Sequence, residues 1–147
     1  MMLLDVNVLV YAFRAESSRH QEWRDWLTGA CAAPFHVPDE VAVGFVRIVT
    51  NHRIFAAPDT VSDARAFLEV LRAAPGWRGL HRRSEAWGVF DRLCAATSLR
   101  GASVHDGWLA ALTIDQGASL VSADRDFARF PGLVWVNPVG EGRVGER

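Results

Sequence analysis

The chain has 147 residues, of which 50% are hydrophobic and 22% are charged, a balance typical of one globular domain rather than a disordered or membrane-embedded chain. Its apolar runs are too short to cross a bilayer. The formal net charge of −1 excludes a uniformly basic surface that coats nucleic acid, because neutralising phosphates drives such binding. All 16 basic residues are arginines, so any chemistry that depends on lysine is excluded.

The N-terminus and the cysteines indicate a protein of a reducing compartment. Residues 1–5 (MMLLD) have no basic region, and Asp5 interrupts the hydrophobic stretch that a signal peptide would continue. Cys31 and Cys94 lie far apart and form no CxxC pair, so we expect both to be small buried thiols rather than a disulfide. We therefore expect a cytoplasmic protein without membrane association.

The first half of the chain is expected to alternate short strands with helices. The expected strands are residues 2–5 and 35–37, and the expected helices are residues 6–13, 18–27 and one that starts at 38–40. Ser18 is a candidate cap for the second helix, and Pro38 suits the first turn of the third. The inner stripe of that third helix is expected to be Val41, Phe45, Ile48 and Val49.

The second half predicts three further helices and two further strands. The helices start at residues 58–59, near 84 and near 104, and the strands are 119–122 and 133–136. Strands separated by helices pair in parallel through right-handed crossovers. The sequence therefore predicts an α/β fold with one domain, residues 1–139, followed by a flexible C-terminal tail, residues 140–147.

Three acids are predicted to meet at one edge of this sheet. Asp5 and Asp124 directly follow expected strands, and functional groups collect outside the carboxyl ends of strands in an open parallel sheet. Asp106 is expected in the first turn of the helix that precedes the strand at 119. Each acid also has an ordinary interpretation as a helix cap or turn former. Asp126 is best interpreted as a turn residue.

Clustered carboxylates repel one another and are costly to desolvate, so such a cluster is tolerated mainly where a cation compensates it. Oxygen-only ligands suit Mg²⁺ or Mn²⁺, which also leave positions for water and for a substrate phosphate. Such ions activate water and stabilise the leaving oxygen in phosphodiester cleavage. The cluster is thus compatible with a metal-dependent nuclease.

Three segments resemble the motifs of a known family. Residues 3–9 (LLDVNVL) resemble the opening motif of PIN-domain ribonucleases, specifically the VapC toxins. Residues 106–124 (DGWLAALTIDQGASLVSAD) resemble the second signature in length and pattern, and residues 122–127 (SADRDF) resemble its end. Residues 44–51 (GFVRIVTN) are similar to one VapC subgroup. The resemblance extends over nearly the whole chain.

The resemblance implies a fold and a set of site residues. The fold is a PIN-like three-layer α/β/α sandwich with a small, mainly parallel sheet. Asp5, Asp106 and Asp124 would be catalytic and metal-facing carboxylates. Asn7 would orient Asp5 by hydrogen bonding, and Ser122 would replace a usual threonine.

One position departs from the family pattern. Many relatives carry a glutamate inside the third helix, where this chain has Gly44. Glu40 lies one helical turn earlier on the same face and could supply the fourth catalytic carboxylate. Asp39 is its competitor, and a third alternative is that this helix supplies no acid.

The resemblance also implies partners. RNA would be the substrate, and the protein would be the toxin of a type II toxin–antitoxin pair whose VapB-like antitoxin blocks the cleft and represses their shared operon. A homodimer is likewise implied. His105 is a candidate phosphate contact or local hydrogen-bond partner, and an exposed tryptophan could stack on a base. The candidate phosphate-binding arginines are Arg14, Arg47, Arg82, Arg83 and Arg125.

Two alternatives remain beside the nuclease. An aspartyl-phosphate protein also places an aspartate after a first parallel strand, but such sites use a lysine that this chain lacks. A non-catalytic PIN-like module that binds RNA or a protein is compatible with Gly44. Failure to bind Mn²⁺ would distinguish this module from the nuclease.

Overall fold

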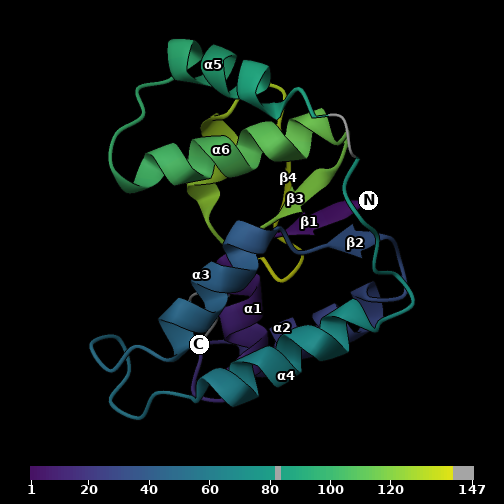
Figure 1. Cartoon of the computed structure of the whole chain (residues 1–147), viewed down its shortest axis with the longest axis vertical. Coiled ribbons are helices and arrows are strands. Elements are labelled where there is room, and N and C mark those ends of the chain that lie inside the picture. The colour runs from purple at the N-terminus through teal and green to yellow at the C-terminus, as the bar shows by residue number, and fades with distance from the viewer. Residues whose placement is uncertain (82–83, 141–147) are drawn as a thin grey trace, which may run out of the picture.

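Four short parallel strands form one sheet at the centre of the molecule (Figure 1). The structure, a computed structural model, describes residues 1–81 and 84–140. The strands are β1 (Met2–Leu4), β2 (Phe35–His36), β3 (Ser119–Val121) and β4 (Val134–Val136), in the spatial order β2-β1-β3-β4. In the register of the sheet, Leu3 pairs with His36 on one side and with Leu120 on the other. The predicted α/β fold with a small parallel sheet is confirmed.

Helices cover both faces of the sheet. They are α1 (Val6–Phe13), α2 (His20–Ala30), α3 (Asp39–Val49), α4 (Val61–Arg72), α5 (Ala86–Ala96) and α6 (Ala102–Asp115), with a 3₁₀ turn η1 (Arg125–Arg129). Figure 1 shows α5 and α6 on one side of the sheet and α1, α2 and α4 on the other. Because both faces are covered, the central strands are apolar without alternation, and Leu3, Leu4 and Leu120 are fully buried.

The order of the strands creates a crevice. From β1 the chain crosses to β2 on one side and later returns to β3 on the other side of β1. Ligands bind in open α/β sheets at such a point, where the connections leave in opposite directions, outside the carboxyl ends of the strands. The amide of Asp5 donates to the Val121 carbonyl at 3.0 Å, so the ends of β1 and β3 are held together at the crevice.

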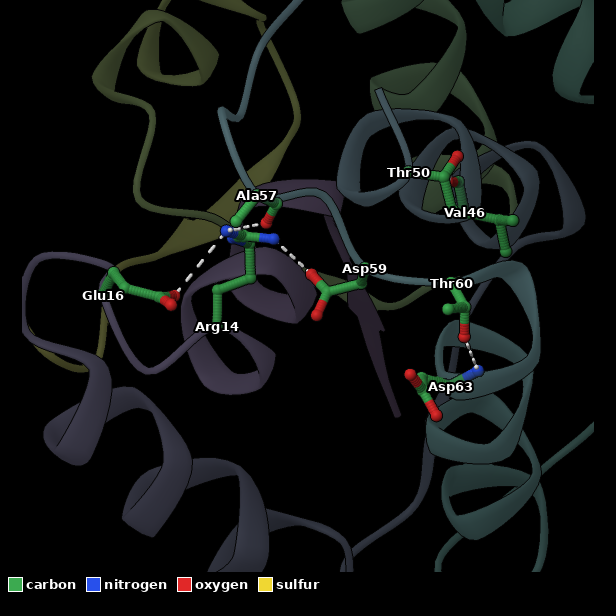
Figure 2. Close-up of polar contacts among 8 residues, drawn as sticks. All are labelled: Arg14, Glu16, Val46, Thr50, Ala57, Asp59, Thr60 and Asp63. Carbon is green, nitrogen blue, oxygen red and sulfur yellow. Dashed lines mark hydrogen bonds and ion pairs between the residues drawn. The ribbon is translucent and has the colours of Figure 1, made fainter. Parts of the chain in front are cut away.

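Several helix starts differ from the sequence prediction, and two of these differences have a clear local cause. Helix α2 begins at His20 rather than at Ser18, because Arg19 adopts a left-handed conformation (φ 56°) just before it. Helix α4 begins at Val61 rather than at residues 58–59. Its cap is Thr60, whose hydroxyl accepts from the amide of Asp63 at 3.0 Å (Figure 2).

Asp59 does not cap α4 but contacts Arg14 instead. Figure 2 shows that it forms an ion pair with Arg14, whose guanidinium also donates to the Ala57 carbonyl at 3.1 Å and lies 3.7 Å from Glu16. The same guanidinium lies 3.8 Å from the centre of the Phe55 ring. Arg14 is only 7% exposed, so this candidate phosphate-binding residue instead ties the segment before α4 to the end of α1.

The outer helices expose residues that the sequence predicted to be internal. Cys94 is exposed and Cys31 is partly buried, and neither forms a disulfide. The prediction of two buried thiols is wrong for Cys94, because α5 is the outermost helix and only one of its faces packs on α6 (Figure 1). In α3, Ala42 is buried and Ile48 is only partly so.

Some predictions concern parts of the chain outside the described residues. Arg82 and Arg83, two of the candidate phosphate-binding residues, lie there, as does all of the predicted tail after Gly140. Within the described residues, no helix is both long and apolar enough to cross a membrane.

Candidate functional site

Asp5 is the best-anchored acid of the predicted cluster. It caps α1, where its Oδ1 accepts from the amide of Val6 at 2.7 Å. Its Oδ2 accepts from the Ser122 hydroxyl at 2.6 Å and from the Asn7 amide nitrogen at 3.0 Å. The residue is only 8% exposed, so its carboxylate has one fixed orientation.

Asn7 and Ser122 connect the ends of β1 and β3. The Asn7 side chain donates to Ser122 Oγ at 3.0 Å and accepts from the amide of Ala123 at 3.1 Å. Ser122 Oγ also accepts from the amide of Asp124 at 3.0 Å. The orientation of Asp5 by Asn7, which the family resemblance implies, is therefore present, and Ser122 supports Asp5 and the Asp124 backbone together.

Asp124 follows β3 and caps the 3₁₀ turn η1. Its Oδ1 accepts from the amide of Asp126 at 2.9 Å. The cap interpretation made from the sequence therefore holds for Asp124, although it does not exclude a second role. Asp126 lies in the first turn of η1 and is exposed, in keeping with its interpretation as a turn residue.

Asp106 approaches the same region from α6. This helix begins at Ala102, so Asp106 is its fifth residue and lies in the second turn rather than in the predicted first turn. The ordinary interpretation as a helix cap is therefore wrong for Asp106. Its side chain is partly buried, and the negative charge of Asp124 raises its pKa.

The electrostatics show that these acids interact. Burial raises the pKa of Asp5, and the charges of Asp106 and Asp124 raise it further, against the hydrogen bonds from Ser122 and Val6. Burial also raises the pKa of Asp106, and Asp124 adds to that rise. Each carboxylate is thus less stable in its charged form than it would be in water.

Two cationic side chains oppose this repulsion. His105 and Arg129 lower the pKa of Asp106, although burial and Asp124 outweigh them. Sequence reasoning did not single out Arg129, which is one of many arginines. The available signal was its position five residues after Asp124, in the same turn.

Glu40 lies near α6 rather than pointing into solvent. Its Oε1 accepts from the Trp108 indole nitrogen at 2.9 Å, and Trp108 lies two residues after Asp106. Asp39 is exposed at the start of α3. A Cβ built on Gly44 would meet nothing within 4 Å, so no neighbouring atom occupies the space at this position.

The side chains as they stand do not form a complete metal cage. Among residues 1–81 and 84–140, no three His, Cys, Asp or Glu side chains converge closely enough to hold a metal ion. Mg²⁺ needs no such cage, because it binds through one or two carboxylates and keeps several waters. Asp5 and Asp106 also have raised pKa values, which a divalent cation would relieve. The donor set therefore fits a hard divalent ion.

The comparisons with known proteins identify the family of the chain. The model of the PIN domain family matches residues 2–133, and the chain therefore belongs to the PIN-domain family. It is 38% identical to VapC ribonuclease Mb2897 of Mycobacterium bovis over 95% of this chain and 96% of that protein. It is also 36% identical to ribonuclease VapC25 of Mycobacterium tuberculosis, over 94% and 99% of the two chains. Within the PIN-domain family these relatives place the chain among the VapC ribonucleases, as the sequence motifs predicted.

Two solved structures have the same fold. A chain of the VapBC2 structure from Rickettsia felis, bound to a DNA fragment from their promoter, matches with a TM-score of 0.69 and 16% identity over 92% of this chain and 97% of that chain. A chain of FitAcB from Neisseria gonorrhoeae matches with a TM-score of 0.62 and 18% identity, over 94% and 98% of the two chains. At these identities the likeness concerns the fold alone.

Proposed function

We propose that this protein is a divalent-metal-dependent endoribonuclease that hydrolyses RNA phosphodiester bonds and is the toxin of a VapBC-like type II toxin–antitoxin pair. One observation carries the proposal. Asp5 is buried at the crevice of a parallel sheet, held by Ser122 and Asn7, and faces the charge of two further acids. A fold stabilised by hydrophobic burial gains nothing from such repulsion, and acids with perturbed pKa values in a crevice are typical of functional sites.

In this mechanism Asp5, Asp106 and Asp124 are the residues that would hold Mg²⁺ or Mn²⁺, directly or through the water ligands of the ion. A bound ion of this kind supplies an activated water for attack on phosphorus and stabilises the leaving oxygen. The protein contributes the orientation of the ligands. Asn7 and Ser122 fix Oδ2 of Asp5, and the η1 turn fixes Asp124 through its cap.

Glu40 is the proposed fourth carboxylate. The Trp108 indole holds its Oε1 against α6, the helix that carries Asp106. Asp39 is exposed at the start of α3, and among the described residues no hydrogen bond or ion pair joins its side chain to α6. We therefore favour Glu40 over Asp39, in a role such as proton acceptor or water ligand beside the metal carboxylates.

The partners follow from the same proposal. The relatives are ribonucleases by name, and one structural relative comes from a VapBC assembly bound to DNA. By extension, a VapB-like antitoxin binds this protein and covers its crevice, and the toxin forms a homodimer. The free toxin would act on RNA in the cytoplasm.

The first experiment compares purified wild-type protein with Asp5→Asn on a mixed RNA substrate, with Mn²⁺, with Mg²⁺ and with EDTA. Metal-dependent cutting should fall by a factor of about 10³ or more in the variant, on the scale of losing a group that acts only in the transition state. Asp25→Asn, on the exposed face of α2, is the matched control and should cut as wild type does. Cutting that survives in Asp5→Asn would refute this site.

A second candidate function is a PIN-like module that binds RNA or a protein without cutting it. The observation that favours it is the absence, among the described residues, of three side chains poised together for a metal. Isothermal titration with Mn²⁺ separates the two candidates. A binding module would take up no Mn²⁺ at the crevice and would still retain RNA on a filter.

A further inference from the structure

A hollow between α5 and α6 is lined largely by aromatic rings. Its volume is about 440 Å³, and its lining residues are Trp87, Phe90, Gly101, Val104, His105 and Trp108. A volume of this size falls within the range of small-molecule sites. Its lining residues come from α5, from α6 and from the residue before α6, two helices that lie side by side in Figure 1.

Core packing does not explain the composition of this hollow. Trp87 is 65% exposed and Val104 is 41% exposed, so both leave large apolar surfaces in contact with water. The ring of Trp87 lies 5.5 Å from that of Phe90 and 6.0 Å from that of Trp108. Phe90 and Trp108 meet edge to face at 5.9 Å. Three rings in mutual contact thus form much of the lining of the hollow, and we consider this exposed aromatic surface a candidate binding site.

The hollow shares a wall with the carboxylate site. His105 and Trp108 line it, and Asp106 lies between them on α6. The indole nitrogen of Trp108 donates to Glu40, so the same side chain lines the hollow and holds the proposed fourth carboxylate. A ligand in the hollow would therefore contact the side chain that positions Glu40.

The chemistry of the lining suits a flat, uncharged and aromatic ligand. Unpaired bases stack on tryptophan and phenylalanine rings, and proteins recognise single-stranded RNA chiefly in this way. Polar groups for the flanking phosphates lie at the rim. His105 lines the hollow, and Arg100 directly precedes the lining residue Gly101.

We propose that this hollow binds one unpaired nucleobase of the RNA substrate, with Trp87 and Trp108 as its stacking surfaces. The proposal rests on the proposed ribonuclease function and adds a substrate class, namely RNA that is single-stranded next to the cleaved bond. The stacked base positions the adjacent phosphodiester over Asp5, Asp106 and Asp124. Stacking is tolerant of base identity, so the hollow selects unpaired over paired RNA rather than one sequence.

The test uses ¹⁹F NMR to detect a change in the surroundings of Trp87 and Trp108 when RNA binds. The protein is labelled with 5-fluorotryptophan, and the ¹⁹F resonances of Trp87 and Trp108 are assigned with Trp87→Phe and Trp108→Phe. A short single-stranded oligoribonucleotide is then added, in EDTA and in Ca²⁺. Both resonances should shift with this oligomer, and neither should shift with a duplex or with an oligomer of equal charge that lacks its bases. Trp26, on α2, serves as the internal reference.

Each other result overturns the proposal. Equal shifts with the base-free oligomer would mean that the phosphates alone are bound. A Trp87 resonance that moves with protein concentration before any RNA is added would mean that the face contacts a second copy of this chain. Resonances that stay unchanged in both EDTA and Ca²⁺ would mean that no base binds there.

Cleavage kinetics give a second readout. Trp87→Ala should raise KM for a single-stranded substrate roughly 10-fold, the loss of about one stacked base, with kcat unchanged. Trp87→Phe should restore most of the affinity, because phenylalanine keeps a ring face. A fall in kcat at unchanged KM would count against a binding role. If the wild-type protein cuts no RNA, the proposed function fails, and the ¹⁹F experiment still decides whether a base binds.

Discussion

Arg14 and Asp5 are almost equally buried, at 7% and 8% exposed. The charges around the two side chains are nevertheless opposite in kind. Arg14 lies against Asp59, the Ala57 carbonyl and the face of Phe55 (Figure 2). Asp5 receives three hydrogen bonds but faces the negative charges of Asp106 and Asp124.

The difference separates a structural role from a functional one. A buried charge with an opposite partner compensates its own desolvation, and removing one partner is costly. Among residues 1–81 and 84–140, Asp5 forms no ion pair with a basic side chain, and its pKa is raised. A divalent cation from solution would supply the missing positive charge.

The largest expected effect is a loss of stability when Arg14 is replaced. Arg14→Met should lower the free energy of unfolding by about 2–4 kcal/mol, because Asp59 loses its partner and the Ala57 carbonyl loses a donor. Urea denaturation measures the loss. Glu16→Gln is the control and should change stability by less than about 0.5 kcal/mol, because Glu16 is 77% exposed. Equal effects of both substitutions would contradict the contrast.

The next largest effect is on the stability that the folded protein gains by binding a metal ion. Mn²⁺ at about 100 times its dissociation constant should stabilise the wild-type protein by about 2.7 kcal/mol. Asp106→Asn should lose most of this gain, whereas Arg14→Met should keep it despite its lower starting stability. Thermal melts with and without EDTA provide the comparison. A full gain in Asp106→Asn would show that this acid is not a ligand.

A pH series without metal tests the electrostatic cause. The pKa of Asp106 is raised above its usual value of 3.8, so the folded state holds this proton more tightly than the unfolded chain does. The stabilisation is complete below pH 3.8 and is lost as the pH rises through the raised value. In EDTA, Asp106→Asn should therefore gain stability over wild type as the pH rises from 4 to 7. Asp25→Asn provides the baseline, and a constant difference would refute the assignment.

The smallest expected effect concerns Gly44. A Cβ there meets open space, so Gly44→Glu adds an acid one turn beyond Glu40 without a clash. Relative to Gly44→Gln, it should tighten Mn²⁺ binding by about 0.5 kcal/mol, roughly twofold, the scale of a partly exposed charge pair. Calorimetric titration of both variants tests this. Identical affinities would place position 44 outside the reach of the metal.

The sequence predicted the features that depend on local patterns. Asp5 and Asp124 follow apolar strands, and the structure places both at the carboxyl ends of β1 and β3 as expected. The PIN-like motifs also gave the correct family. Periodicity succeeds here because strands buried on both faces leave a continuous apolar run.

The misses depend on tertiary contacts. Pro58-Asp59 looked like a helix start, but Asp59 pairs with an arginine 45 residues earlier, and Thr60 became the cap. Cys94 was expected to be buried, but α5 packs on one face only and leaves it exposed. The link between Glu40 and Trp108 joins residues 68 apart. No local pattern signals contacts of that separation.

The hydrogen bond from Ser122 to Asp5 closes a loop of 117 residues, and this separation affects the nascent chain. A ribosome adds about 5–20 residues per second, so roughly 6–23 seconds pass between the synthesis of Asp5 and the synthesis of Ser122. During translation the emerging fragment has neither β3 nor Asp124. A chain that stalls or is cleaved before residue 119 therefore lacks both Ser122 and Asp124, and the site around Asp5 is complete only once synthesis is almost finished.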